Sequence, residues 1–321
     1  MKVLVTGAFG SLGTNVLERL LKTEHEITCF VTRRKASRKK AKKYTRVCRV
    51  FFGDIRNLSE VKTAVEGQDV VLHLAAIVPP RINYEDPNYA YEVNVNGTAN
   101  VLQAIKESNN HAKLIYISSV AVFGDTRARG ACVLGPEEPV NPNKDDLYAQ
   151  QKVESEKMIM QSGVTWSILR FGFMPNFDKK MKLDPMLFEV PLDTNMELLH
   201  IKDAAKAVVT ALEKEEIWHK ILHIAGGEKC RVTYKEFITA MFEALGIGAL
   251  PDRAFGTKDF HCVFFDTDYS QQLLQYQQRT FEDLIAEFRE KNRKLLPWIK
   301  LFRPLIRKWI LKQSPYYKTN E

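Results

Sequence analysis

The sequence predicts an α/β fold in which a doubly wound parallel sheet carries helices on both faces. Three observations lead to this prediction. Short apolar stretches alternate with helical patterns, each stretch is apolar almost throughout, and the first one runs into a glycine-rich turn and a helix. Continuous apolar runs are typical of strands that are buried on both faces, and alternation with helices is typical of parallel connections. We expect a smaller mixed lobe and a basic amphipathic tail to follow the sheet.

The expected elements can be placed by residue number. Seven apolar stretches predict strands, at residues 3–6, 26–32, 49–54, 69–75, 113–119, 165–171 and 220–225. Helical patterns lie at 14–22, 36–46, 58–66, 88–109, 147–162, 203–213 and 233–246, and mostly helical sequence continues to about residue 294. In a sheet of this kind, ligands bind beyond the carboxyl ends of the strands, where the strand order reverses.

The first strand leads into three glycines spaced three residues apart, Gly7, Gly10 and Gly13. The first permits a tight turn, the second allows a pyrophosphate to approach closely, and the third lets the following helix pack against the strand. The N-terminus of that helix then points at the negative charge. We therefore expect a dinucleotide here, bound by the turn residues Gly7, Phe9, Gly10, Ser11, Leu12 and Gly13. A structural turn without a ligand is the alternative.

The composition is that of a globular protein, with 45% hydrophobic residues in a chain of 321. The first residues lack the basic and apolar regions of a secretion signal, and no apolar run reaches the roughly 18 residues of a membrane-spanning helix. Five scattered cysteines without Cys-x-x-Cys spacing predict reduced thiols, with neither a disulfide framework nor a zinc site. His73 and His200 are interpreted as structural histidines. We expect a cytoplasmic protein.

The net charge of +8 comes from two basic segments. Residues 33–49 carry ten Lys and Arg without an acid, and residues 291–318 carry nine without an acid. The rest of the chain is acidic, with 28 Lys and Arg against 39 Asp and Glu. Because neither basic segment lies in a motif that reads nucleic acid, we do not expect a nucleic-acid partner.

Tyr148 and Lys152 lie four residues apart on a predicted helix and therefore share one face. A lysine ammonium can lower the pKa of a nearby phenol, which then serves as an acid and base near neutral pH. Chance alone supplies about one such pair in a chain of this composition. The stretch ISSVAVFG at 117–124 strengthens the prediction, because it places a hydroxyl at the carboxyl end of a strand, on the edge that carries the glycine turn.

These features together resemble the extended short-chain dehydrogenase/reductase superfamily, the NAD(P)-dependent epimerase/dehydratase group with a Rossmann fold. The resemblance covers at least residues 1–230 through the motifs TGAFGSLG, GDI, HLAA, VNVNGTANVL, ISSVAVFG, YAQQK, ILR and HIKDAAKA. It implies that Tyr148 is the catalytic acid/base and that Lys152 holds the nicotinamide ribose and lowers the tyrosine pKa. It also implies that Ser119 hydrogen-bonds the reacting oxygen, while Ser118 ends the strand or, alternatively, takes that catalytic role.

The same resemblance implies further contacts with the cofactor. Asp54 and Ile55 would border the adenine, Ala75 and Ala76 the ribose, and Asn94 the backbone near the phosphates. Most of these positions also have a structural interpretation. Asp54 suits a turn, the two alanines suit close packing, and Asn94 suits an internal hydrogen bond of a helix.

The end of the second strand bears on the choice of cofactor. NAD enzymes of this architecture place an acid there for the ribose hydroxyls, whereas the 2′-phosphate of NADP needs a cation. The chain has Arg33 and Arg34 at this place and no acid between Ile27 and Gly53. NADP(H) is therefore favoured, with Arg33 the first candidate and Arg34 the second, and NAD is the alternative. Both arginines could instead begin a solvated basic helix.

The expected reaction is hydride transfer between NADP(H) and a carbonyl or alcohol of a small, apolar substrate. A dehydratase of this superfamily would carry Asp-Glu directly after the hydroxyl residue, where this chain has Val120 and Ala121. The 29 residues between Arg170 and His200 are short for a nucleotide-sugar epimerase. They carry Lys179, Lys180 and Lys182 and the apolar residues Met174, Phe177, Met181, Leu183, Met186, Leu187 and Phe188. These suit an apolar substrate or ordinary core. An epimerase and a dinucleotide-binding regulatory protein are the alternative functions.

We expect a nucleotide-binding domain at 1–172 with 203–226 packing back on it, a substrate lobe at 173–202 and 227–290, and a tail at 291–321. Aromatic and aliphatic residues of the tail recur at helical spacing among Lys and Arg, and two prolines predict two short helices rather than one. Residues 291–318 suit contact with an anionic membrane surface. Docking on the protein's own body and a homodimer contact are the alternatives.

Overall fold

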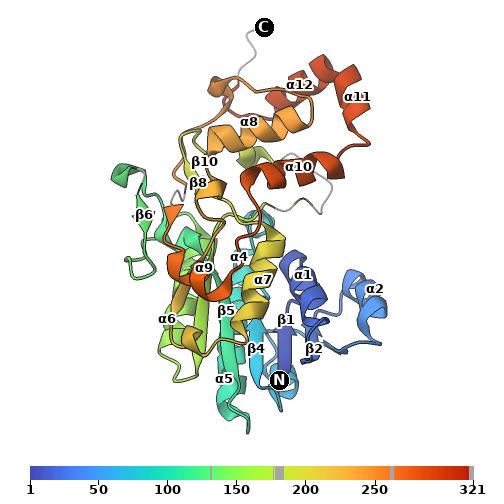
Figure 1. The fold of residues 1–321 in the computed structure, drawn as a ribbon, viewed down its shortest axis with the longest axis vertical. Helices are drawn as coiled ribbons and strands as arrows, with labels where there is room; N and C mark the ends of the chain where they lie inside the picture. The colour runs from blue at the N-terminus through green and yellow to red at the C-terminus, as the bar shows by residue number, and fades with distance from the viewer. Residues whose placement is uncertain (131, 176, 178–183, 261–263, 318–321) are drawn as a thin grey trace.

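Figure 1 shows the chain as a computed structural model, which describes residues 1–130, 132–175, 177, 184–260 and 264–317. A central sheet is built from β1 (Lys2–Thr6), β2 (Glu26–Val31), β3 (Arg49–Phe52), β4 (Val70–His73), β5 (Lys113–Ser119), β7 (Trp166–Phe171) and β9 (Ile221–Ile224). The strand order is β3-β2-β1-β4-β5-β7-β9, and neighbouring strands are parallel. The chain direction across the sheet reverses beside β1, so a ligand is expected beyond the carboxyl ends of β1 and β4.

Helices cover both faces of this sheet. One face carries α1 (Ser11–Leu20), α2 (Lys35–Tyr44), α7 (Ile201–Ala211) and α9 (Asp268–Leu274), and the other carries α3 (Leu58–Val65), α5 (Gly97–Glu107) and α6 (Leu147–Met160). Successive residues of β1 alternate between the two cores, with Val3 and Val5 on the first and Leu4 on the second. This alternation explains why the strand is apolar throughout, and it confirms the predicted doubly wound sheet.

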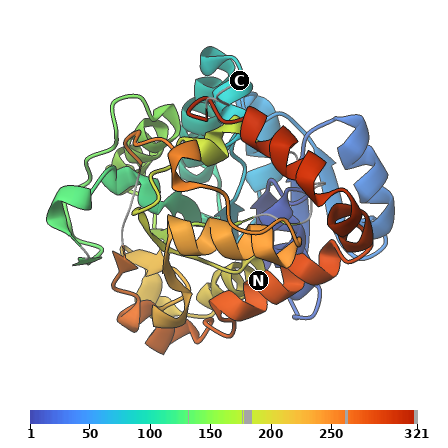
Figure 2. The same ribbon diagram turned by 90° about the horizontal axis from the view of Figure 1, so that it is seen from above.

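A lobe lies beyond the carboxyl ends of the strands, above the sheet in Figure 1. It holds the antiparallel pair β8 (Asn195–Glu197) and β10 (Arg231–Thr233) and the helices α8 (Tyr234–Ala244), α10 (Phe281–Lys291), α11 (Leu296–Leu301) and α12 (Arg303–Lys312). Seen from above, α8, α10 and α12 cross in front of the sheet (Figure 2). Their buried faces form one core with the segment that follows β7. The domain boundaries drawn from the sequence stay a prediction.

The helical pattern predicted at 88–109 is confirmed with a π-helical turn inside it, and the helical sequence predicted up to 294 is wrong in part. The helix expected at 88–109 is α4 (Pro87–Tyr91) followed by a π-helical turn at Glu92–Asn96 and then α5. The mostly helical sequence expected up to 294 is wrong for 247–260, which holds a 3₁₀ turn at Asp252–Ala254, and for β11 (Phe264–Phe265), which pairs with β6 (Val133–Leu134). The local sequence does not indicate the π-helical turn or the pairing of β11 with β6, because both depend on tertiary contacts.

The tail forms two helices, as the prolines predicted. Pro297 and Pro304 each occupy the first turn of their helix, where the missing N–H and the fixed φ angle suit helix initiation. In the part of the chain that the structure describes, no helix combines the length and the apolar character needed to cross a membrane.

Candidate active site

The glycine turn connects β1 to α1 with almost no space for side chains. Gly7 has a φ angle of +68°, and a Cβ placed there would lie 2.9 Å from the Cα of Ala75. A Cβ on Gly13 would lie 2.3 Å from the carbonyl oxygen of Gly7. Gly10 is the N-cap of α1 and has no side chain that could cap the helix. The positive end of α1 is therefore presented by backbone alone, which suits a bound phosphate group.

Lys40 of α2 reaches this turn, which the sequence did not predict. Its ammonium donates to the carbonyl oxygen of Phe9 at 2.8 Å and to the hydroxyl of Thr14 at 3.3 Å. The Phe9 ring stacks on the Tyr44 ring, with centroids 5.6 Å apart, so the C-terminal half of α2 is tied to the glycine turn and the start of α1. The helical spacing of the basic run was visible in the sequence, but which lysine turns inward depends on the packing of α2.

The carboxyl ends of β1 and β4 are joined by buried polar side chains. The two ring nitrogens of His73 lie 2.7 Å from the Thr6 hydroxyl and 3.0 Å from the Thr98 hydroxyl, and Thr6 also accepts from the backbone N–H of Ala75. Burial lowers the pKa of His73 to about 3, so the ring is neutral at physiological pH. The structural interpretation of His73 is confirmed. Ala75 and Ala76 are half-buried at this edge.

Asn94 lies in the interior and connects two segments that border the site. Its amide oxygen accepts from the backbone N–H of Ile77 at 2.7 Å, and its amide nitrogen donates to the Ile77 carbonyl and to the side chain of Gln151. These bonds are structural, but they join different segments and are not the helix-internal bond that the sequence suggested. The side chain fixes the segment after β4 against α6.

Ser119, Tyr148 and Lys152 come together at the carboxyl end of β5. The Lys152 ammonium donates to the Ile117 carbonyl at 2.6 Å and to the Tyr116 hydroxyl at 3.1 Å, and it lies 5.7 Å from the centre of the Tyr148 ring. Lys152 is buried, and Ser119 and Tyr148 are half-buried. The sequence did not predict Tyr116, which lies on β5 and whose hydroxyl accepts a hydrogen bond from Lys152.

The ionisation of this group differs in part from the expectation. Burial raises the pKa of the Tyr148 phenol, while the charge of Lys152 and a hydrogen bond with Ser119 act in the opposite direction. Burial also lowers the pKa of the Lys152 ammonium, against the influence of Tyr148 and Glu156. The lysine therefore lowers the phenol pKa as expected, but burial outweighs it in the protein without ligand.

Ser118 belongs to a separate buried network. Its hydroxyl donates to Glu156 at 2.5 Å, and Glu156 also forms a two-bond ion pair with Arg170, at 2.8 and 3.1 Å. All three side chains are almost completely buried. A buried carboxylate needs such partners, so these contacts fit the interpretation of Ser118 as a structural residue at the end of β5.

The two arginines after β2 have different partners. Arg33 forms a two-bond ion pair with Glu60 of α3, at 2.7 and 3.0 Å, and Glu60 also accepts from the backbone N–H of Asp54. Arg34 donates to the hydroxyl of Tyr89, a neutral partner, at 3.1 Å. An acid does therefore lie near the end of β2, but it comes from α3. Glu60 was not predicted because it lies outside the stretch between Ile27 and Gly53, where an acid was expected for NAD.

Asp54 and Ile55 are also held by protein contacts. The Asp54 carboxylate forms an ion pair with Arg56 at 2.6 Å, and Arg56 lies over the Tyr89 ring, 4.9 Å from its centre. The hydrogen bonds from Arg56 lower the pKa of Asp54, so the carboxylate stays charged. Ile55 is buried, and a Cβ on Gly97 would lie 2.8 Å from its side chain. Arg56 and Tyr89 are therefore further candidates for lining an adenosine site.

The segment expected to form an apolar substrate site is partly outside the described residues. This applies to Lys179, Lys180, Met181, Lys182 and Leu183. Of the others, Phe188 is completely buried, and Phe177 and Leu187 pack against the same core of the lobe. Met174 packs against the core of the sheet. These side chains fit the alternative of ordinary core better than a substrate site.

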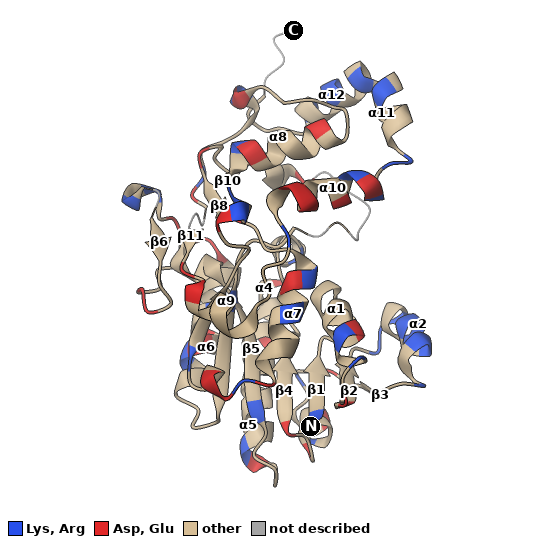
Figure 3. Cartoon of the chain, viewed as in Figure 1, with Lys and Arg blue, Asp and Glu red and all other residues tan. Residues whose placement is uncertain are grey.

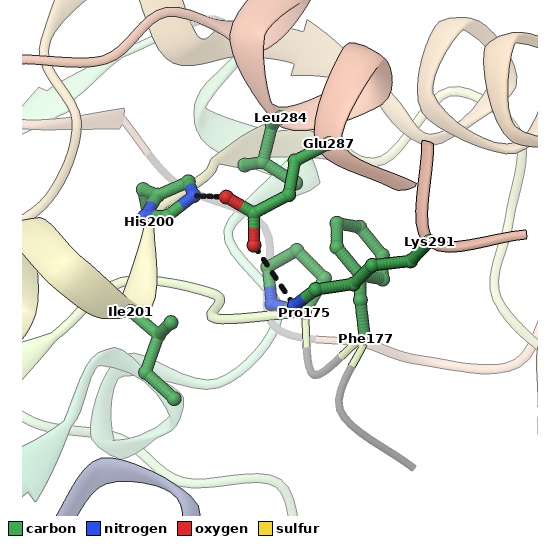
Figure 4. A pocket seen from close by; sticks show the side chains of 7 residues that line it. All are labelled: Pro175, Phe177, His200, Ile201, Leu284, Glu287 and Lys291. Carbon is green, nitrogen blue, oxygen red and sulfur yellow. Dashed lines mark hydrogen bonds and ion pairs between the residues drawn. The ribbon is translucent and has the colours of Figure 1, made fainter. Parts of the chain in front are cut away.

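His200 lies at a contact between the sheet and the lobe. Its ring caps the N-terminus of α7, and its other nitrogen lies 3.1 Å from Glu287 of α10. Glu287 also pairs with Lys202 at 3.1 Å and Lys291 at 2.8 Å. Figure 4 shows His200, Glu287 and Lys291 around a hollow of about 10 Å³, room for one water molecule, lined also by Pro175, Phe177, Ile201 and Leu284. The contacts fit the structural interpretation of His200.

Comparison with known proteins gives partial matches among curated sequences. A 3-beta-hydroxysteroid dehydrogenase from Mycolicibacterium neoaurum is 31% identical over 191 residues, 56% of this chain and 50% of that protein. The CDP-paratose 2-epimerase of Salmonella typhi is 31% identical over 149 residues, 42% of this chain and 44% of that protein. The chain spans about half the length of the curated relatives it matches.

Solved structures match nearly the whole chain in fold. A dTDP-glucose 4,6-dehydratase from Bacillus anthracis, in complex with NAD, superposes with a TM-score of 0.75 at 18% identity, over 93% of this chain and 98% of the other. A UDP-glucuronic acid 4-epimerase from Bacillus cereus, in complex with NAD, gives 0.74 at 20% identity, over 92% and 100%.

The family assignment rests on the N-terminal half of the chain. Residues 3–172 match the family model described as the NAD dependent epimerase/dehydratase family. This range contains the glycine turn, the strands β1 to β7 and the cluster of Ser119, Tyr148 and Lys152. The chain belongs to the NAD-dependent epimerase/dehydratase family.

Proposed function

We propose that the protein is an oxidoreductase that transfers a hydride between NADP(H) and a carbonyl or alcohol group of a small, apolar substrate. The observation that carries the proposal is the cluster of Ser119, Tyr148 and Lys152 at the carboxyl end of β5. Parallel strands place this cluster on the same edge of the sheet as the glycine turn. A hydroxyl, a phenol and an ammonium at that edge are the groups that a reacting carbonyl needs.

The residues around the glycine turn fit a dinucleotide. A Cβ on Gly7 or Gly13 would collide with the protein's own backbone, so these glycines allow the tight turn. The N-terminus of α1 would hold the pyrophosphate at the exposed Gly10. Ala75 and Ala76 would lie against the ribose beside Gly7. When bound, the nicotinamide supplies or accepts the hydride.

Each of the three clustered side chains has a role in the proposal. Tyr148 gives a proton to the substrate oxygen during reduction and takes it back during oxidation. Ser119 donates a hydrogen bond to the same oxygen and stabilises its developing charge. Lys152 lowers the phenol pKa and binds the ribose hydroxyls, and its bonds to Tyr116 and Ile117 fix the direction of its ammonium.

The preference for NADP(H) rests on the cations at the far end of the cofactor site. Arg34 has a neutral partner in Tyr89, so it can turn to a 2′-phosphate at little electrostatic cost. Arg33 would have to leave Glu60, which makes it the weaker candidate and reverses the order inferred from the sequence. Lys40 adds a third cation near the turn. NAD stays the alternative cofactor, because Glu60 lies near the end of β2, where an acid could accept from the ribose hydroxyls of NAD.

The choice between a reductase, a dehydratase and an epimerase rests on Val120 and Ala121 and on the activities of the relatives. Val120 and Ala121 stand where a dehydratase of this superfamily would have an acid pair, which argues against dehydration. A hydroxysteroid dehydrogenase among the relatives is consistent with an apolar alcohol or ketone. The sugar-nucleotide epimerases among the relatives make an epimerase the second candidate. A regulatory protein that only binds the dinucleotide is the third.

A cofactor-consumption assay separates these functions. The purified full-length protein is mixed with NADPH or NADH and a panel of apolar ketones and aldehydes, and with UDP-sugars in parallel. Net oxidation of NADPH by a ketone, lost in Tyr148→Phe, supports the proposed reductase. Interconversion of a UDP-sugar with the cofactor retained supports the epimerase. Tight cofactor binding without turnover of any compound supports the regulatory protein.

A further inference from the structure

The two helices of the tail expose an unusual set of large apolar side chains. We define their outer face by the exposed residues Leu295, Trp298, Leu301, Phe302, Leu305 and Trp309. Leu301 and Leu305 are 68% and 67% exposed, and Trp298 and Trp309 are 63% and 55% exposed. The Trp298 and Phe302 rings are parallel, with centroids 6.4 Å apart. Single exposed apolar residues are common on protein surfaces, but six large ones within residues 295–309 suggest a partner.

The opposite face of the same helices is fixed to the lobe. Ile310 and Leu311 are buried in the core of the lobe, and Ile306 packs against it. Arg303 and Arg307 donate to the carbonyl oxygen of Ile247, at 3.1 and 3.3 Å. The protein's own body therefore covers the inner face of the tail and holds the outer face toward the surroundings. Docking on the protein's own body therefore accounts for the inner face of the tail but not for its exposed outer face.

The charged residues within the tail itself are all positive. Lys294, Lys300, Lys308 and Lys312 are exposed in this segment, and Arg293 pairs with Glu290 of α10 at 2.9 Å. The sequence contains no Asp or Glu from residue 291 to residue 320, although the chain outside the two basic segments is acidic. Figure 3 shows the blue positions on α11 and α12 at the end of the lobe remote from the sheet.

We propose that the outer face of the tail binds the headgroup layer of an anionic lipid membrane. Tryptophan, phenylalanine and leucine side chains bury themselves at the boundary of headgroups and acyl chains, and lysines beside them pair with lipid phosphates. Each cation near an anionic surface strengthens binding about fivefold. The apolar residues and the cations of the outer face supply both parts of this interaction, on helices that are already folded and oriented.

A second copy of the chain would fit the apolar residues but not the charges, and a nucleic acid would fit the charges but not the apolar residues. A symmetric contact with a second copy of the chain would place the same lysines opposite one another, which is unfavourable for an interface without acids. A nucleic acid would pair with the lysines but would leave the exposed leucines without an apolar environment. An anionic membrane satisfies both.

The proposal fixes which part of the molecule faces the membrane. The tail lies on the lobe, at the opposite end of the molecule from α5 in Figure 1. The lobe would therefore lie next to the lipid, and the amino ends of the sheet strands would point away from it. This inference stands on the tail alone and does not depend on the proposed reaction.

Co-sedimentation of the full-length protein with lipid vesicles tests the proposal. The vesicles contain phosphatidylcholine alone or with 30% phosphatidylserine, at about 0.1 M salt and again at about 0.5 M. We expect binding to the anionic vesicles that weakens at the higher salt concentration. A deletion at residue 290 is a poor test, because it would uncover the core of the lobe around Ile310 and Leu311.

Surface substitutions separate the contributions of apolar residues and charge. Leu301→Ser, Leu305→Ser and Trp309→Ser combined should reduce vesicle binding at least tenfold, because these side chains are exposed and carry the apolar contact. Lys294→Gln, Lys308→Gln and Lys312→Gln combined should reduce it about 100-fold. The matched controls are Val47→Ser, Val133→Ser and Met160→Ser for exposed apolar residues, and Lys106→Gln, Lys144→Gln and Lys157→Gln for charge. The controls should stay within about twofold of the wild type.

Three results would overturn the proposal. The first is equal binding to neutral and anionic vesicles, or no binding to either. The second is anionic binding that the apolar triple variant keeps, since a purely electrostatic contact would not need the outer face. The third is a concentration-dependent dimer in the absence of lipid that both tail variants abolish, measured by analytical ultracentrifugation.

Discussion

At the scale of the residue, the environment of Lys152 decides how the proposed chemistry works. Two hydrogen-bond acceptors, the Tyr116 hydroxyl and the Ile117 carbonyl, hold an ammonium that is otherwise buried. Its charge lowers the pKa of Tyr148 against the effect of burial. The sequence could predict the pair of Tyr148 and Lys152 from their spacing on a helix. It could not predict Tyr116, because that contact joins a helix to a strand 36 residues away.

The charge of Lys152 should be visible in the pH dependence of the reaction. In Lys152→Met, Tyr148 loses the positive charge that lowers its pKa, so the pKa of the phenol rises further. In the oxidation direction, where Tyr148 acts as a base, we expect the pH profile of kcat/KM to shift to higher pH and kcat to fall about 10²–10⁴-fold. Tyr116→Phe keeps the charge and should shift the profile much less. An unshifted profile in Lys152→Met would contradict this role.

The partners of the two arginines predict how cofactor selectivity changes. Arg34→Ala should weaken NADPH binding about tenfold or more and leave NADH binding nearly unchanged, because only NADPH has a 2′-phosphate. Glu60→Gln should strengthen NADPH binding relative to NADH, since it releases Arg33 from its ion pair. Equilibrium titrations that follow cofactor fluorescence measure the dissociation constants of NADPH and NADH for the wild type and both variants. Equal losses of both cofactors in Arg34→Ala would favour NAD as the natural cofactor.

At the scale of the element, the sequence predicted those helices and strands that have a local sequence pattern. The seven strands were predicted because a strand buried on both faces is apolar throughout, and α11 and α12 because prolines mark their first turns. The π-helical turn at Glu92–Asn96 and the pairing of β6 with β11 leave no such local mark. For the same reason Glu60 and Lys40 were missed, since α3 and α2 bring them to the site only in the folded chain.

The contact between α7 and α10 should contribute stability that depends on pH. Although burial opposes it, hydrogen bonds from Lys291 and Lys202 lower the pKa of Glu287 from 4.5 to about 2. A pKa that is lower in the folded state stabilises the fold above the unfolded value, and this contribution is lost as the pH falls from about 4.5 to 2. Glu287→Gln should cost about 1–2 kcal/mol at pH 7, after allowance for partial exposure.

Thermal unfolding measures this effect. Glu287→Gln should lower Tm by a few degrees at pH 7 and by less near pH 4, where the unfolded wild-type carboxylate already binds protons while the folded one stays charged. Glu243→Gln on α8, an exposed carboxylate, is the matched control and should leave Tm unchanged at both values. If the difference between wild type and Glu287→Gln were the same at both values, the ion pairs would not be its cause.

At the scale of the whole molecule, two neutral histidines are buried in the central sheet and link its stability to pH. His73 lies between Thr6 and Thr98, and His223 lies between the rings of Phe123 and Phe265. Burial lowers the pKa of each to about 3, against 6.5 in an unfolded chain. A lowered pKa means that the folded state binds the proton less well than the unfolded state. The stability is therefore complete above pH 6.5 and is lost as the pH falls from 6.5 toward 3.

The slope of this loss gives the last prediction. Each buried neutral histidine contributes up to about 1.4 kcal/mol per pH unit below its unfolded pKa, so the two together give a slope of about 3 kcal/mol per unit near pH 5. His223→Phe keeps a ring in the same aromatic environment and removes one titrating group, so it should lower the slope by about 1.4 kcal/mol per unit. The remaining slope comes from His73 and from His200, whose pKa burial also lowers. Urea unfolding at pH 7.5, 6 and 5 measures the slope in both proteins. The pH window lies above the range in which unfolded carboxylates take up most of their protons, which isolates the histidines. Equal slopes in the two proteins would mean that His223 is charged or solvated in the native state, and the sheet would then owe its acid sensitivity to other groups.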